Sequence, residues 1–151
     1  LNGVEDVIAA MLRFKTSIPI QHSCARTLSL LIRATGDNGR RRVVQAGGAE
    51  AIIFAMERFG SSSGGNSAVA VAVEGCAAIA VLSAMDSVTE GEILSKRLRK
   101  LRADRAVKQV MQAHKGNQVV QEKGKECLKN LHALRSGGGW FSRIRQRNRR
   151  Q

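Results

Sequence analysis

The sequence predicts an all-α protein built from about three unequal copies of one helical unit, and three observations support this. The first is composition: of 151 residues, 43% are hydrophobic and only 3% aromatic, and there is one proline. Helix formers such as alanine, leucine and arginine are abundant, whereas strand-rich sandwiches depend on aromatic and turn residues. The other two observations are patterns that recur along the chain.

The first recurring pattern is a short helix that ends in a methionine. "GVEDVIAAM" ends at Met11, "GAEAIIFAM" at Met56 and "RADRAVKQVM" at Met111, so the pattern returns after 45 and then 55 residues. We therefore expect three copies of the same helix.

The second recurring pattern is a longer helix that follows each methionine. Apolar positions align on steps of 51 and 49 residues, and small or branched residues precede them by four and eight positions. Offsets of four, four and three place these side chains on one helical face. The aligned sets are Ile20, Val71 and Val120; Cys24, Gly75 and Gly124; Leu28, Ile79 and Leu128; and Leu31, Leu82 and Leu131.

A third, shorter helix is expected between copies, in "GRRRVVQA" (39–46) and, extended, in "TEGEILSKRLRKL" (89–101). Polar residues that can cap a helix N-terminus precede both stretches. They are Asp37 or Asn38 for the first and Asp86 or Ser87 for the second. Gly47 and Gly48 then allow a sharp corner into the next helix, where a side chain would obstruct the turn.

Three stretches carry a resemblance to a known family: "AGGAEAIIFAM", "VEGCAAIAVLSA" and "CLKNLHAL". They resemble the second and third helices of the armadillo repeat, over residues 3–135. The resemblance implies a right-handed α-solenoid of about three repeats (1–35, 36–86 and 87–135), followed by a Gly hinge and basic tail (136–151). The first repeat lacks its first helix, so we expect missing sequence or another subunit to cover that apolar end.

Two further departures from the armadillo pattern concern the later repeats. The third repeat has a lengthened first helix, and "GSSSGGNS" (60–67) separates the second and third helices of the middle repeat. We interpret 60–67 as an insertion in an exposed turn.

The resemblance implies a binding groove along the third helices, where an asparagine ladder grips an extended peptide. The matching positions are Leu30, Val81 and Asn130, of which only Asn130 fits, so a groove lined by Leu30, Ala80 and Val81 suits an apolar helix or loop better. Asn130 could equally face solvent or bond locally. The candidate groove residues are Arg26, Leu30, Arg33, Ala80, Val81, Lys129 and Asn130.

The charge is confined to the C-terminal part of the chain. Residues 1–92 hold 8 Lys and Arg against 9 acids, and residues 93–151 hold 17 against 3. The pattern predicts attraction to a polyanion such as RNA, or to acidic protein such as a tubulin tail. The candidate residues are Lys96, Arg97, Arg99, Lys100, Arg102 and Arg105, and in the tail Trp140, Phe141, Arg143, Arg145, Arg147, Arg149 and Arg150.

Two roles remain open for the aromatic pair of the tail, which follows the flexible "SGGG" (136–139). Trp140 and Phe141 could stack on bases beside the arginines, or could dock on the open end of the helical stack as a plug. With Ile144 they form too small an apolar side for stable anchoring at a membrane surface.

The sequence offers no pair of residues that we can propose as a catalytic nucleophile and base. Cys24, Cys76 and Cys127 form an odd, widely spaced set, which favours a reducing intracellular compartment, mitochondrial or cytoplasmic, over a disulfide-stapled domain. Cys24 falls in the small-residue column and is expected to be buried, so no metal site is predicted with His22, His114, Cys127 and His132. "GSSSGG" lacks the Gly-Lys-Ser/Thr of a phosphate loop. We expect no cofactor, signal peptide, transit peptide or membrane span.

Two functional hypotheses follow. The first is a structural subunit of a large assembly, such as the ribonucleoprotein of an organellar ribosome, that packs on protein through its helices and on RNA or an acidic partner through its basic end. The second is a protein-binding adaptor that uses the groove, including a cytoskeletal or ciliary armadillo protein. Neither is expected to act as a free monomer.

Overall fold

The computed structural model describes residues 2–62, 65–84 and 88–136, and every regular element in these ranges is helical. The all-α class is therefore confirmed. In chain order the elements are α1 (Gly3–Arg13), α2 (Ile18–Gln45), α3 (Gly48–Ala55), the π-helical turn η1 (Met56–Gly60), α4 (Gly65–Ser83), α5 (Val88–Lys100), α6 (Ala103–Ala113) and α7 (Gln118–Arg135).

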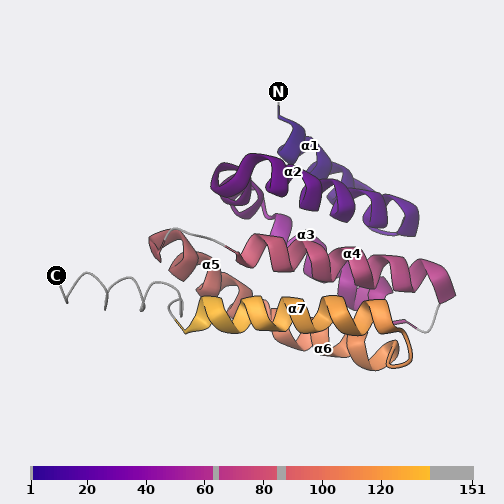
Figure 1. The fold of residues 1–151 in the computed structure, drawn as a ribbon. Helices are drawn as coiled ribbons and strands as arrows, with labels where there is room; N and C mark the ends of the chain where they lie inside the picture. Colours follow the sequence, from indigo (N-terminus) through magenta and orange to yellow (C-terminus); the bar gives the residue numbers. More distant parts are fainter. Residues whose placement is uncertain (1, 63–64, 85–87, 137–151) are drawn as a thin grey trace.

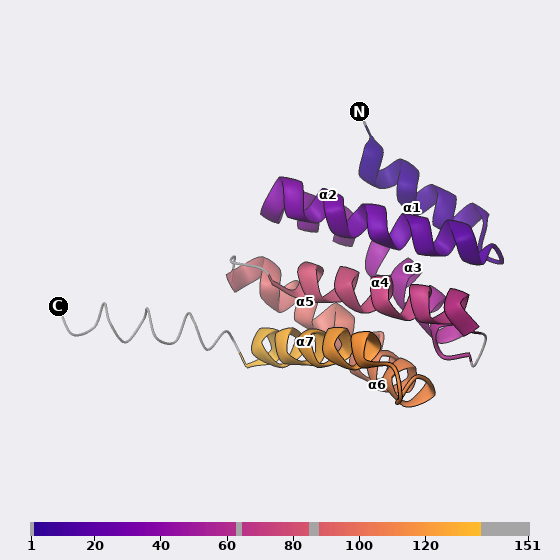
Figure 2. The same ribbon diagram turned by 45° about the vertical axis from the view of Figure 1, so that its right-hand side comes forward.

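The helices form two layers (Figures 1 and 2). α2, α4 and α7 lie side by side in one layer, with α4 in contact with both of the others. α1, α3 with η1, and α6 form the layer behind them, and each packs against its partner in the first layer. α5 lies at one edge, in contact with α6 and α7. The longer helices that carry the second recurring pattern are thus neighbours.

α4 is the central helix of the core. Within the described residues it alone is long and apolar enough to span a membrane, but more than half of it is buried under its neighbours, as in the core helix of a folded domain. Its one acidic residue, Glu74, is half-buried and lies 4.0 Å from Nε2 of His22 on α2.

The three methionines occupy matching places in the core. Met11 and Met56 are buried and Met111 is nearly so. A Cβ atom placed on Gly75 would overlap the Cγ and Sδ atoms of Met56, and one placed on Gly124 would overlap the same atoms of Met111. Close packing of the methionine therefore explains why the aligned positions Cys24, Gly75 and Gly124 hold small residues.

A glutamine that donates two hydrogen bonds to the end of the preceding helix recurs in the first and last copies; Gln21 is buried and Gln121 partly buried. Nε2 of Gln21 donates to the carbonyls of Met11 and Phe14, at 2.8 and 3.0 Å. Nε2 of Gln121 donates to the carbonyls of Met111 and His114, at 2.7 and 3.2 Å. These carbonyls lie at the C-terminal ends of α1 and α6, where a helix leaves its last acceptors unpaired.

The predicted glycine corner is confirmed, and each of its two glycines is needed for a different reason. Gly47 adopts the left-handed conformation, with φ of 82°. A Cβ on Gly48 would collide with Cγ1 of Val43 and approach the Val43 carbonyl oxygen to 3.0 Å. The equivalent corner before α6 places Arg102 in the left-handed region, with φ of 54°.

One predicted boundary is confirmed and another differs in the structure. The short helix expected at 39–46 is present as the second part of α2, which a kink at Gly36, with φ of 60° and ψ of −137°, divides into two helices. The segment 60–67 is not wholly an exposed insertion, because α4 begins at Gly65 and Gly60 is buried against Ala72 and Val110. The proposed caps Asp86 and Ser87 lie outside the described residues.

Candidate interaction surfaces

The groove residues predicted from the repeat pattern divide into exposed and buried groups. On α2, Leu30 has an exposed fraction of 58% and is flanked by the exposed Arg26 and Arg33. On α4, Ala80 and Val81 are buried, so the expectation that they line an accessible groove is wrong. On α7, Lys129 is exposed and Asn130 is half-buried.

Asn130 neither faces solvent fully nor bonds locally, so both of its expected roles are corrected: it is half-buried and its side chain bonds to a different helix, α4. Its Nδ2 donates to the Ala80 carbonyl at 3.0 Å, and Nε of Arg40 donates to the neighbouring Val81 carbonyl at 2.9 Å. Both carbonyls lie in the last turn of α4, where intrahelical partners run out. These two side chains therefore supply hydrogen-bond partners to carbonyls at the end of α4.

The cationic residues around the corner between α5 and α6, here called the basic corner, are mostly unpaired. Nε of Arg97 donates to Oε1 of Glu50 at 2.5 Å. The remaining five are exposed, and no acidic side chain in the described part of the chain forms an ion pair with them. Their charge is therefore available to an anionic partner. They are Lys96, Arg99, Lys100, Arg102 and Arg105.

Arg102 is the one non-glycine residue with positive φ in the described residues. A left-handed conformation costs an ordinary L-residue about 1–2 kcal/mol. The equivalent position of the preceding corner is Gly47, which adopts this conformation without that cost. A strained arginine at the centre of an exposed cationic cluster favours a binding role for this corner.

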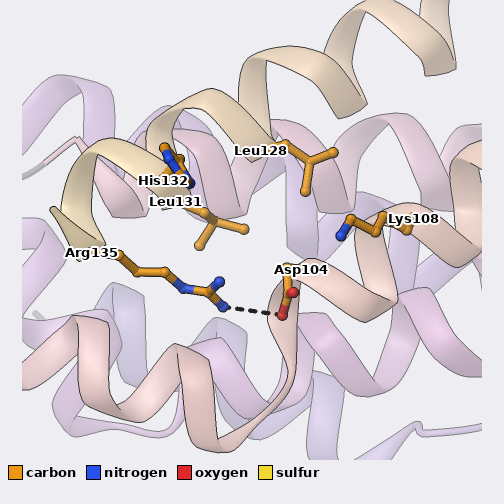
Figure 3. A pocket seen from close by; sticks show the side chains of 6 residues that line it. All are labelled: Asp104, Lys108, Leu128, Leu131, His132 and Arg135. Atoms are coloured by element: carbon orange, nitrogen blue, oxygen red, sulfur yellow. Dashed lines mark hydrogen bonds and ion pairs between the residues drawn. The ribbon is translucent and has the colours of Figure 1, made fainter.

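A pocket of about 260 Å³ lies between α6 and α7 (Figure 3). Leu128 and Leu131 supply its apolar wall, and four polar side chains surround it: Asp104, Lys108, His132 and Arg135. We call these six residues the end pocket. Nη2 of Arg135 donates to Oδ1 of Asp104 at 3.1 Å. Burial raises the pKa of Asp104, but the hydrogen bond and charge of Arg135 outweigh it and hold the pKa below its usual range.

Apolar side chains are exposed at the opposite end, on α1 and α2. Leu12 and Phe14 join Leu30 among the exposed large hydrophobic residues, and the Arg13 guanidinium lies 5.5 Å from the centre of the Phe14 ring. Ile20 and Leu31 are only partly buried, although their counterparts in α4 and α7 are fully buried. This end therefore retains the apolar character of a packing surface.

The cysteines are free thiols in differing environments. Burial raises the pKa of Cys76 to about 12 and raises that of Cys127 as well, so both remain protonated thiols. Cys24 is half-buried, which corrects the expectation of full burial. Within residues 2–62, 65–84 and 88–136, no three His, Cys, Asp or Glu side chains gather where a metal could bind.

Sequence reasoning identified the basic corner but missed the end pocket. Lys108 and His132 look like ordinary surface residues until they are compared with the same columns of the earlier copies, which are apolar or small: Ile8 and Ile53 for Lys108, and Ile32 and Ser83 for His132. The tail residues predicted to bind a polyanion lie outside the described residues: Trp140, Phe141, Arg143, Arg145, Arg147, Arg149 and Arg150. Comparison with known protein families, curated proteins and solved structures finds no match to this chain.

Proposed function

We propose that the chain is a non-enzymatic scaffold of the armadillo type, a right-handed α-solenoid of about three repeats that acts as a structural subunit of a larger assembly. The parallel layers support this architecture, since each repeat of a solenoid contacts only its neighbours. α2 contacts α4, and α4 contacts α7. The recurring methionine and glutamine contacts supply further support, because equivalent residues make equivalent contacts in more than one copy.

In this proposal the basic corner binds RNA, as in a ribonucleoprotein. One observation carries it: five exposed cations without acidic partners in the described residues surround one helix corner. Acidic residues balance basic ones in the first 92 residues, so the excess positive charge of the chain lies in the part that contains this corner. Lysine and arginine on such a surface neutralise phosphates and release counterions, which makes binding salt-dependent.

The test compares two double variants that change the net charge equally. Lys96→Glu/Lys100→Glu reverses charge at the basic corner, and Lys108→Glu/Lys129→Glu reverses it at the end formed by α6 and α7. Binding of single-stranded poly-uridine is measured against salt concentration. We expect the corner variant to reduce the slope of log affinity against log salt by about 1 to 2, since each lost phosphate contact contributes about 0.7. Equal affinities and slopes for wild type and corner variant would contradict the proposal.

A second candidate function is the protein-binding adaptor, including a cytoskeletal or ciliary one. It is favoured by the exposure of Leu30 between Arg26 and Arg33, an arrangement that suits an apolar helix with acidic flanks. Leu30→Asp tests it in a pull-down from cells, with the corner variant as the control. An adaptor loses its protein partner through Leu30→Asp alone, whereas an RNA-binding subunit loses RNA through the corner variant. Both functions are consistent with a reducing intracellular compartment.

A further inference from the structure

The end of the stack formed by α6 and α7 differs from the faces inside the stack. In each of the first two copies, four positions are buried where the next helices pack, and all four are apolar or small. They are Ile8, Ala25, Ser29 and Ile32 in the first copy, and Ile53, Cys76, Ala80 and Ser83 in the middle copy.

In the last copy the same four positions are all basic: Lys108, Lys125, Lys129 and His132. The three on α7 are spaced by four and three residues, so they share one helical face with Leu128. Lys108 on α6 and the three α7 residues therefore form one surface around the end pocket, here called the end face: Lys108, Lys125, Lys129 and His132. A terminal repeat needs a polar surface, but that requirement does not specify one sign of charge.

The end pocket adds an apolar hollow to this charged surface. Figure 3 shows the amino group of Lys108 and the guanidinium of Arg135 directed toward the pocket from opposite sides. Asp104 is the only carboxylate in the pocket lining, and its ion pair with Arg135 neutralises it. Lys108 has no ion-pair partner within the described residues, so the rim carries a net positive charge beside Leu128 and Leu131.

We infer that the end face binds an acidic segment of another protein, with one large apolar side chain in the end pocket and flanking carboxylates on Lys108 and Lys129. Charge complementarity selects the occupant. The chain's own tail carries five arginines and no acid, so the cations of the rim repel it. RNA phosphates would use the cations but not the apolar wall. The inference goes beyond the proposed RNA site, which lies at the basic corner.

The experiment uses the full chain and a fluorescein-labelled peptide in which one phenylalanine lies between glutamates, followed by fluorescence anisotropy. A matched peptide replaces the phenylalanine with alanine. We expect the phenylalanine peptide to bind about tenfold more tightly, because a buried phenylalanine side chain contributes enough for that ratio. Lys108→Glu/Lys129→Glu should weaken binding of this peptide about tenfold, since two ion pairs are lost and replaced by repulsion.

The corner variant Lys96→Glu/Lys100→Glu is the matched control, because it changes the net charge equally and should leave peptide binding unchanged. Equal weakening by both double variants, or equal binding of both peptides, would show attraction to net charge alone and overturn the inference. Loss of poly-uridine binding through the end-face variant would instead identify an RNA surface. Peptide binding only after removal of residues 137–151 would identify the tail as the occupant. Either result overturns the inference without testing the basic corner.

Discussion

Replacing Gln21 by methionine should destabilise the protein through two lost hydrogen bonds rather than through a cavity. Gln21 is 1% exposed, and its amide donates to the carbonyls of Met11 and Phe14 at the end of α1. Methionine nearly matches the shape of glutamine but donates no hydrogen bond. Each bond contributes about 1 kcal/mol, and a buried carbonyl left without a partner costs about 1–3 kcal/mol.

The added apolar burial of the methionine side chain offsets about 1 kcal/mol of this cost. We therefore expect Gln21→Met to lower the free energy of unfolding by about 2 kcal/mol and the Tm by about 4–8 °C. Gln121→Met is the matched control, because Gln121 makes the same two kinds of bond but is only partly buried. Water can reach the carbonyls there, so the loss should be about 1 kcal/mol.

Urea and thermal unfolding followed by far-UV circular dichroism measure both variants against wild type. The reasoning requires the order wild type, Gln121→Met, Gln21→Met in decreasing stability, with unchanged m-values. A Gln21→Met protein as stable as wild type would show that water or another donor satisfies the carbonyls of Met11 and Phe14. Equal losses at both positions would show that burial does not set the cost.

Three further predictions concern the corners, the thiols and the pocket. Gly47→Ala should lower the free energy of unfolding in urea by about 1–2 kcal/mol, because alanine is strained at φ of 82°. Arg102→Gly should change this free energy little, because the relief of backbone strain offsets the greater entropy of glycine in the unfolded chain. Equal losses for the two variants would contradict this reasoning. A thiol reagent at mildly alkaline pH should modify Cys24 but not Cys76 in the folded protein, as mass spectrometry would reveal, because burial raises the pKa of Cys76 to about 12. The lowered pKa of Asp104 gives stability that is present above its unfolded pKa and lost as pH falls, so Asp104→Asn should be less stable at neutral pH, with the difference disappearing in acid; a difference constant with pH would refute it.

Residue patterns predicted the helices well because the packing that forms them repeats. The methionine columns, the small-residue column and the glycine corner each reflect a contact made in more than one copy, such as Met56 on Gly75 and Met111 on Gly124. Because the same contact is made in each copy, the same residue types recur at regular intervals, and this can be seen in a single sequence. The helix boundaries near Gly36 and Gly65 were less predictable, because a single glycine can interrupt, begin or end a helix.

The interaction surfaces were less predictable than the fold. A run of cations at 96–105 is visible in sequence, but only packing shows that Glu50 neutralises Arg97 and leaves its neighbours unpaired. Val81 looked accessible because its register position matched Leu30, yet it is buried in the structure. Whether a position is covered depends on the helices that follow, and that information is distant in the chain.

Polar bonds join α4 to both of its neighbours at the same place. Nδ2 of Asn130 on α7 donates to the Ala80 carbonyl, and Nε of Arg40 on α2 donates to the adjacent Val81 carbonyl. Two consecutive carbonyls in the last turn of α4 thus fasten one helix on each side. The three long helices should therefore move together at this end, so that a displacement of α2 or α7 by a bound partner is passed through α4 to the helix on the far side.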